Sequence, residues 1–159
     1  MAIWQYKFYV FPKENYADYA ENFKKLWHSE YFDEGILWKT NKVEIDFFDE
    51  VNNLLKKGKS WSKDLIIYGK VESDCFEILC ENGYVISVSF RINYTNNYDY
   101  LLSSLIDFFI QNGLILLDEQ LELLPLNFLS IKSVIENAPQ VEKYRILSRQ
   151  SDKKIDDTN

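Results

Sequence analysis

Apolar and polar residues alternate along residues 4–11, which predicts a half-buried strand that Pro12 ends. The same kind of signal predicts three consecutive strands at residues 65–71, 75–80 and 84–93. The Asn82-Gly83 pair between the last two is a strong hairpin signal. Because strands joined by such short turns must be antiparallel, we expect these three to form a meander.

Spacings of three and four between apolar residues predict four helices, at about residues 15–28, 43–57, 98–112 and 127–137. Asn15 is positioned to cap the first of them, and His28 falls at its end. Two short strands are expected at residues 114–117 and 121–124. The elements together predict an α+β two-layer sandwich with a mainly antiparallel sheet, helices packed on one face and the other face at least partly exposed.

The chain shows no internal repeat and no linker, so we expect one α+β domain over residues 1–147. Its 159 residues are 47% hydrophobic and 27% charged, which is typical of a globular domain. Residues 148–159 are polar and without periodicity, and they are predicted to form a disordered tail.

The charge balance bears on the kind of partner. Eighteen Lys and Arg stand against 25 Asp and Glu, a formal net charge of −7. This disfavours a nucleic-acid binder, which needs clustered positive charge. The aromatic fraction of 16% predicts an aromatic core and leaves rings available for a contact surface.

Cys75 and Cys80 lie in one predicted strand, and their odd spacing places them on opposite faces. We therefore expect free thiols without a disulfide, and the spacing is not that of a zinc site. The N-terminus lacks a signal-peptide pattern, and no apolar run is long enough to cross a membrane. Free thiols and these absences favour the cytoplasm and a protein without a membrane partner.

Candidate chemistry is sparse. His28, the only histidine, is expected to carry a favourable charge at a helix end rather than act in catalysis. Asp46, Asp49 and Glu50 share one face of the second predicted helix. That face is interpreted as a solvated surface, as a recognition surface for a basic protein, or as a carboxylate site. We expect no catalytic residue, no metal and no cofactor, because neither a nucleophile–base set nor a glycine-rich phosphate loop is present.

The polar face of the sheet is a second candidate surface. Tyr9, Tyr68 and Arg91 are the residues on it most typical of protein interfaces. The whole predicted set is Gln5, Lys7, Tyr9, Tyr68, Lys70, Glu77, Ser87, Ser89 and Arg91. An ordinary wet sheet face remains the alternative.

Several segments together carry a family resemblance: residues 4–12, residues 60–62, and above all residues 85–93 followed by a helix and residues 113–116. Over about residues 4–145 the chain resembles small bacterial immunity proteins from polymorphic-toxin loci. Asn93 stands where we expect an acid in many relatives.

The resemblance implies a non-enzymatic, cytoplasmic inhibitor that binds one cognate toxin domain stoichiometrically. It supplies no transferable site residues, so the candidate partner-binding residues stay the acidic face and the sheet face described above. A basic toxin would suit the acidic face. The alternatives are a structural or adaptor subunit, and a small-ligand domain with an apolar pocket lined by residues such as Trp38 or Trp61. Nothing in the sequence indicates a homo-oligomer.

Overall fold

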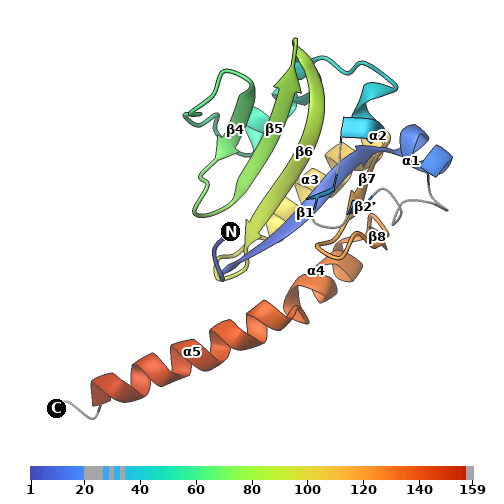
Figure 1. Ribbon diagram of the computed structural model, residues 1–159. Helices are drawn as coiled ribbons and strands as arrows, with labels where there is room; N and C mark the ends of the chain where they lie inside the picture. Colours follow the sequence, from blue (N-terminus) through green and yellow to red (C-terminus); the bar gives the residue numbers. More distant parts are fainter. Residues whose placement is uncertain (20–26, 29–30, 33–34, 157–159) are drawn as a thin grey trace.

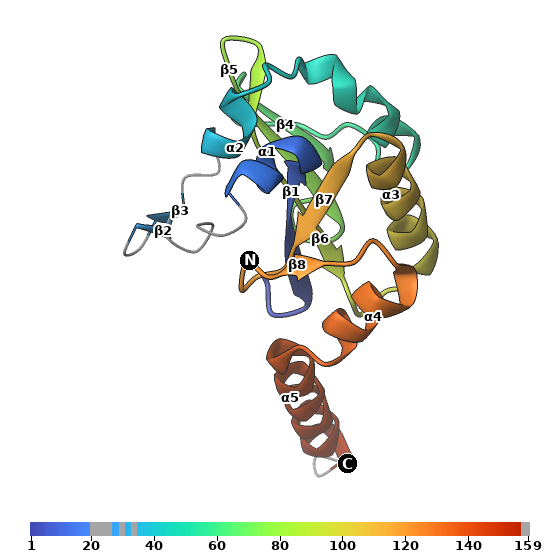
Figure 2. The ribbon, with the colours of Figure 1, turned by 90° about the vertical axis from the view of Figure 1, so that its right-hand side faces the viewer.

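The computed structural model describes residues 1–19, 27–28, 31–32 and 35–156 (Figure 1). Within these residues, six strands form one antiparallel sheet in the order β4-β5-β6-β1-β7-β8. The strands are β1 (Gln5–Pro12), β4 (Leu65–Gly69), β5 (Cys75–Glu81), β6 (Tyr84–Asn93), β7 (Leu114–Leu117) and β8 (Leu123–Leu124). A separate pair, β2 (Trp27–His28) and β3 (Tyr31–Phe32), lies on the side of this sheet opposite α3 (Figure 2).

The helical elements lie beside the sheet, except α5, which leads away from it (Figures 1 and 2). They are α1 (Lys13–Tyr19), α2 (Gly35–Lys39), the 3-10 helix η2 (Ile45–Asn53), α3 (Asp99–Gln111), α4 (Phe128–Glu136) and α5 (Pro139–Asp156). The α+β fold predicted from the sequence is confirmed. None of the helices that the structure describes is long and apolar enough to cross a membrane.

The predicted meander is β4-β5-β6, and its second turn is the expected hairpin. Asn82 has φ 52° and Gly83 has φ 82°, so both central residues adopt the left-handed conformation that the sequence pair permits. The first strand then adds to the meander, because β1 pairs with β6 on one side and with β7 on the other.

Aromatic rings hold the core together. Phe8, Phe90, Phe76 and Tyr68 lie opposite one another on four neighbouring strands, so their side chains form a continuous row on one sheet face. The rings of Phe8 and Phe90 stack with centroids 4.8 Å apart, and Phe109 from α3 packs against Phe90 at 5.6 Å. Offset aromatic contacts of this kind add to the free energy gained by burying the rings.

The segment after α2 forms a 3-10 helix where the sequence predicted an α-helix from about residue 43 to residue 57. Its buried residues, Phe48 and Val51, are three positions apart and pack against the core. Ile45 and Leu54 extend the same three-residue spacing and are partly buried. A helix with three residues per turn places such a series on a single line.

Three sequence-based predictions differ from the structure: those for Asn15, for His28 and for residues 148–156. Asn15 lies inside α1 rather than capping it, and its buried side-chain amide donates to the Leu37 carbonyl oxygen. His28 belongs to β2, so it is not at a helix end; residues 20–26 of the predicted first helix lie outside the described residues. Residues 148–156 continue α5, where the sequence predicted a disordered tail.

Helix α5 leads away from the sheet in both views (Figures 1 and 2). Its first turns are attached to the body: Val141 is buried, the Tyr94 hydroxyl donates to the Gln140 carbonyl oxygen at 3.1 Å, and the Tyr94 ring meets Tyr144 edge-on. Farther along, Ile146 and Leu147 are exposed.

Candidate functional site

The acidic residues singled out from the sequence lie together on the exposed side of η2. Asp46, Asp49 and Glu50 are all exposed, while Phe48 and Val51 of the same helix are buried in the core. In a 3-10 helix, residues three apart are eclipsed, so Asp46 and Asp49 form one row and Glu50 stands in the next. The buried residues fix the direction in which the carboxylates point.

These carboxylates have no ion-pair partner among the residues that the structure describes. Glu44, the residue before η2, is also exposed. Glu44 and Asp46 border a shallow hollow of about 380 Å³ that the hairpin residues Asn82, Gly83 and Tyr84 complete. We call Glu44, Asp46, Asp49 and Glu50 the acidic surface. Uncompensated charges that a folded core holds in place give a surface complementary to a cationic protein.

The structure brings only some residues of the second candidate surface to one face of the sheet. Strand register brings Lys7, Tyr9, Ser89, Arg91 and Glu77 to one face, since Lys7 opposes Arg91, Tyr9 opposes Ser89, and Ser89 opposes Glu77. The Lys7 ammonium lies 4.7 Å from the centroid of the half-buried Tyr9 ring, a cation–π contact.

Tyr68 does not belong to this face, and its assignment as a partner-binding residue is wrong. It opposes Phe76 in the register of β4 and β5, and only 1% of it is exposed. Burial raises the pKa of its hydroxyl, and the negative charge of Asp49 adds to the shift. Tyr68 is therefore a core residue.

Arg91 lies on the predicted face but is committed to a buried ion pair. Its Nη2 is 2.6 Å from Glu77 Oε1 and 3.8 Å from Cys75 Sγ. Its Nε is buried without a hydrogen-bond partner. A contact between Arg91 and a partner would have to break the ion pair with Glu77. We therefore interpret Arg91 as a residue that stabilises the sheet.

Both cysteines are free and buried, as the sequence predicted. Cys75 lies on the face of Glu77 and Arg91, and Cys80 is on the core face with Phe76 and Ile78. Burial, with the nearby charge of Glu77, raises the pKa of the Cys75 thiol to about 11. Such a thiol is protonated at neutral pH and is a poor nucleophile.

In the described part of the chain, neither tryptophan lines the apolar pocket that the small-ligand alternative requires. Trp38 is fully buried against Phe48, with ring centroids 6.0 Å apart, and Trp61 is 76% exposed. Among the residues that the structure describes, no three His, Cys, Asp or Glu side chains are grouped so that they could hold a metal ion.

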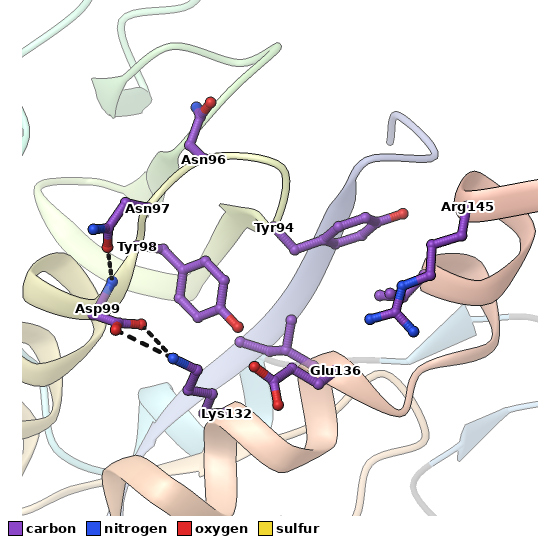
Figure 3. Close-up of a pocket in the computed structure, with 10 residues that line it drawn as sticks. Tyr94, Asn96, Asn97, Tyr98, Asp99, Lys132, Glu136 and Arg145 are labelled. Carbon is purple, nitrogen blue, oxygen red and sulfur yellow. Dashed lines mark hydrogen bonds and ion pairs between the residues drawn. The ribbon is translucent and has the colours of Figure 1, made fainter. Parts of the chain in front are cut away.

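A different hollow, of about 280 Å³, lies where the β6–α3 connection meets α4 and the start of α5 (Figure 3). Its apolar lining comes from Ile135, Val141 and the rings of Tyr94 and Tyr98. Its polar lining is Asn96, Asn97, Asp99, Lys132, Glu136 and Arg145. We call it the Tyr98 hollow. It could not be predicted from the sequence, because residues 94–99 are separated in the chain from residues 132–145 and no short motif indicates that they meet.

Two charges of this hollow neutralise each other. Lys132 Nζ lies 2.9 Å from Asp99 Oδ1 and 3.2 Å from Asp99 Oδ2, and the Asp99 amide donates to Asn97 Oδ1 at 3.1 Å. The Lys132 ammonium also faces the ring of Tyr98, 5.9 Å from its centroid. The hydrogen bond with Asp99 raises the pKa of Lys132, so this side chain stays cationic.

Tyr98 is only 6% exposed, and its hydroxyl points toward the ends of Lys132 and Glu136 (Figure 3). Burial raises its pKa to about 12, and the charges of Glu136 and Asp99 contribute. The hydroxyl therefore remains a hydrogen-bond donor at neutral pH. In the described part of the chain it has no hydrogen-bond partner.

In comparisons with known proteins, no family model, curated protein sequence or solved structure matches this chain significantly. The function must therefore be inferred from the surfaces and side chains of this chain.

Proposed function

We propose that this protein is a non-enzymatic, cytoplasmic bacterial immunity protein that binds a cognate toxin domain one to one and thereby neutralises it. The single observation that carries the proposal is the acidic surface. Asp46, Asp49 and Glu50 are exposed, have no ion-pair partner among the described residues, and are held on a helix anchored by Phe48 and Val51. Such a surface favours rapid association with a basic protein domain.

The resemblance of residues 4–145 to immunity proteins supplies the class of partner. Phe47, on η2 between two of the acids, is 37% exposed and offers an apolar contact at the centre of the charged surface. Protein interfaces commonly combine a buried aromatic anchor with a polar rim.

The test is a survival assay in a susceptible bacterium. The product of the gene directly upstream is expressed with and without this protein, and surviving cells are counted. Survival restored by the protein, together with co-purification of the two chains in a one-to-one ratio, would support the proposal. An upstream product that is not toxic, or that kills equally in the presence of this protein, would overturn it.

The adaptor alternative is favoured by one observation, the exposed apolar residues Ile146 and Leu147 on the protruding part of α5. A helix that presents apolar residues away from its own domain can pair with another chain. Light scattering of the full chain over a wide concentration range separates the two functions, because an adaptor that self-associates would increase in mass and a monomeric inhibitor would not.

A further inference from the structure

The Tyr98 hollow has a charge arrangement that the proposed inhibition does not use. After Asp99 and Lys132 are paired, two more charged side chains remain on its lining, the exposed Glu136 and the exposed Arg145, and Arg145 forms a long ion pair with Glu142. Arg145 Nη1 is 3.8 Å from Glu142 Oε2, too far for a hydrogen bond, so its guanidinium donors are available. Among the described residues, Glu136 makes no ion pair.

The side chains come from different elements and converge on one space. Glu136 projects from α4 and Arg145 from α5, and Figure 3 shows both at the hollow into which the Tyr98 hydroxyl is directed. Glu136 contributes to the raised pKa values of both Tyr98 and Lys132, which agrees with a carboxylate facing the inside. The Tyr98 residue is 6% exposed, and its hydroxyl lies at the hollow, where it can donate to an occupant.

The volume restricts what can enter. At about 280 Å³, the hollow is slightly smaller than the usual range for small-molecule sites, which begins near ~300 Å³. Ile135 and Val141 add an apolar lining beside the charged groups. A small molecule with one cationic group, one anionic group and a short apolar part would match this lining.

We propose that the Tyr98 hollow binds a small zwitterion of the free α-amino acid class, with its ammonium group at Glu136 and its carboxylate at Arg145. The Tyr98 hydroxyl and the remaining N–H of Lys132 donate further hydrogen bonds to the ligand. The apolar side chain of the ligand lies against Ile135 and Val141. This binding is independent of the inhibition proposed above and uses no residue of the acidic surface.

The experiment is a titration of the full chain by calorimetry and by amide NMR with three probes. L-leucine carries both charges, N-acetyl-L-leucine carries only the carboxylate, and L-leucinamide carries only the ammonium. We expect leucine to bind at least about tenfold more tightly than either capped analogue, because each analogue loses one charge-assisted contact. The amide signals that shift should be those of Tyr98, Glu136 and Val141.

Two variants test which residue binds the ammonium group of the ligand and which binds its carboxylate. Glu136→Gln should weaken leucine binding by about tenfold and abolish its preference over N-acetyl-leucine, because the ammonium contact is lost. Arg145→Gln should instead abolish the preference over leucinamide. Arg149→Gln, an exposed arginine one turn farther along α5, is the matched control and should leave all three affinities unchanged. A merely structural effect of a substitution would weaken all three probes equally.

Several results would overturn the inference. They are equal affinity for the three probes, binding of one capped analogue as tightly as leucine, NMR shifts away from the hollow, or the absence of saturable leucine binding. The last result would mean that Arg145 and Glu136 compensate each other directly in solution. None of these results depends on whether the protein inhibits a toxin.

Discussion

At the residue scale, the sequence distinguishes the two faces of a strand only where polar residues alternate with apolar ones. In β6 they do, and Ser87, Ser89 and Arg91 were correctly placed on one face. In β4 the run Leu65-Ile66-Ile67-Tyr68 is apolar throughout, so the pattern does not show which side chains face the core. The hydroxyl of Tyr68 suggested a surface position, whereas the pairing with Phe76 places the ring in the core.

The position of Tyr68 has a measurable consequence. Tyr68→Ala should lower the free energy of unfolding by about 3 kcal/mol, because it removes a buried ring and leaves a cavity beside Phe76. Tyr100→Ala is the matched control, since Tyr100 is 79% exposed and alanine favours the helix it occupies. Urea unfolding checks both variants; similar losses of stability would contradict the burial of Tyr68.

The thiol of Cys75 makes the stability of the protein depend on alkaline pH. Its pKa is about 11 in the fold, against 9.0 for an unperturbed thiol, so the unfolded chain loses this proton first as pH rises. Between pH 9 and pH 11 this one group should lower the free energy of unfolding by about 1.4 kcal/mol per pH unit, while below pH 9 its contribution is constant.

Cys75→Ala should remove that contribution and flatten the alkaline part of the stability curve, whatever its effect at neutral pH. Urea unfolding of both proteins at intervals from pH 8 to pH 11 measures the difference in slope. Parallel curves for the variant and the natural chain would show that Cys75 is not the titrating group.

At the element scale, the sequence predicted an α-helix where η2 is a 3-10 helix, although its apolar residues do have the spacing of a 3-10 helix. Ile45, Phe48, Val51 and Leu54 recur every three residues, which is the period of a 3-10 helix. Phe47 and Leu55 also fit spacings of three and four with these residues, and such spacings favour an α-helix. Nine residues are unusually many for a 3-10 helix, so the α-helix was the better supported expectation before the packing was known.

The β5–β6 turn was predicted correctly because its backbone requirement is local, whereas the predicted strand 65–71 extends two residues past Gly69, where β4 ends. Gly83 in the β5–β6 hairpin and Gly69 at the end of β4 both have positive φ, of 82° and 83°. They differ in their surroundings. A Cβ on Gly83 would meet nothing within 4 Å, whereas one on Gly69 would lie 2.2 Å from the Asp74 carbonyl oxygen.

This difference predicts unequal effects of the same substitution. Gly83→Ala should cost about 1 kcal/mol, the price of a left-handed conformation for a residue with a Cβ. Gly69→Ala should cost about 3 kcal/mol, because the turn between β4 and β5 must also shift to relieve the clash. Thermal and urea unfolding of the pair measure the excess, and equal losses would show that the Gly69 turn can move freely.

Helix α5 shows why the end of the chain could not be predicted. Beyond Leu147 the residues are polar and without an apolar face, which is typical of a disordered segment. The helix that the structure describes is attached through Val141 and Tyr144 and continues outward from them. An already formed first turn makes further turns easier, since the costly step of helix formation is nucleation.

At the scale of the whole molecule, the strand order depends on contacts between distant segments, which local sequence patterns do not predict. The meander and α3 follow from local patterns, but the insertion of β1 between β6 and β7 is a long-range choice. The Tyr98 hollow likewise depends on how α4 and α5 dock against the end of β6. Three of the four acids of the acidic surface, Asp46, Asp49 and Glu50, could be placed together from the sequence because they lie within five residues and needed only one exposed helical face.

The distribution of charge over the molecule gives the last prediction. Reversal of the three acids in Asp46→Lys, Asp49→Lys and Glu50→Lys should slow association with the toxin that the survival assay identifies, by about tenfold at low salt. The salt dependence of association should become weaker, because less electrostatic steering is left to screen. Stopped-flow or surface-plasmon measurements of association over a range of ionic strength check both effects.

A control with the same net charge separates a local surface from a general effect. Reversal of Glu72, Asp107 and Glu142, which are exposed in the β4–β5 turn, on α3 and on α5, also changes the formal net charge from −7 to −1. If the acidic surface is the contact, this control should associate nearly as fast as the natural chain, because steering depends most on charges close to the interface. If both triple variants slow association equally, the toxin responds to the total charge of the molecule and the contact lies elsewhere. In that case the remaining candidate is the sheet face around Lys7 and Tyr9, where the cation–π pair is partly exposed.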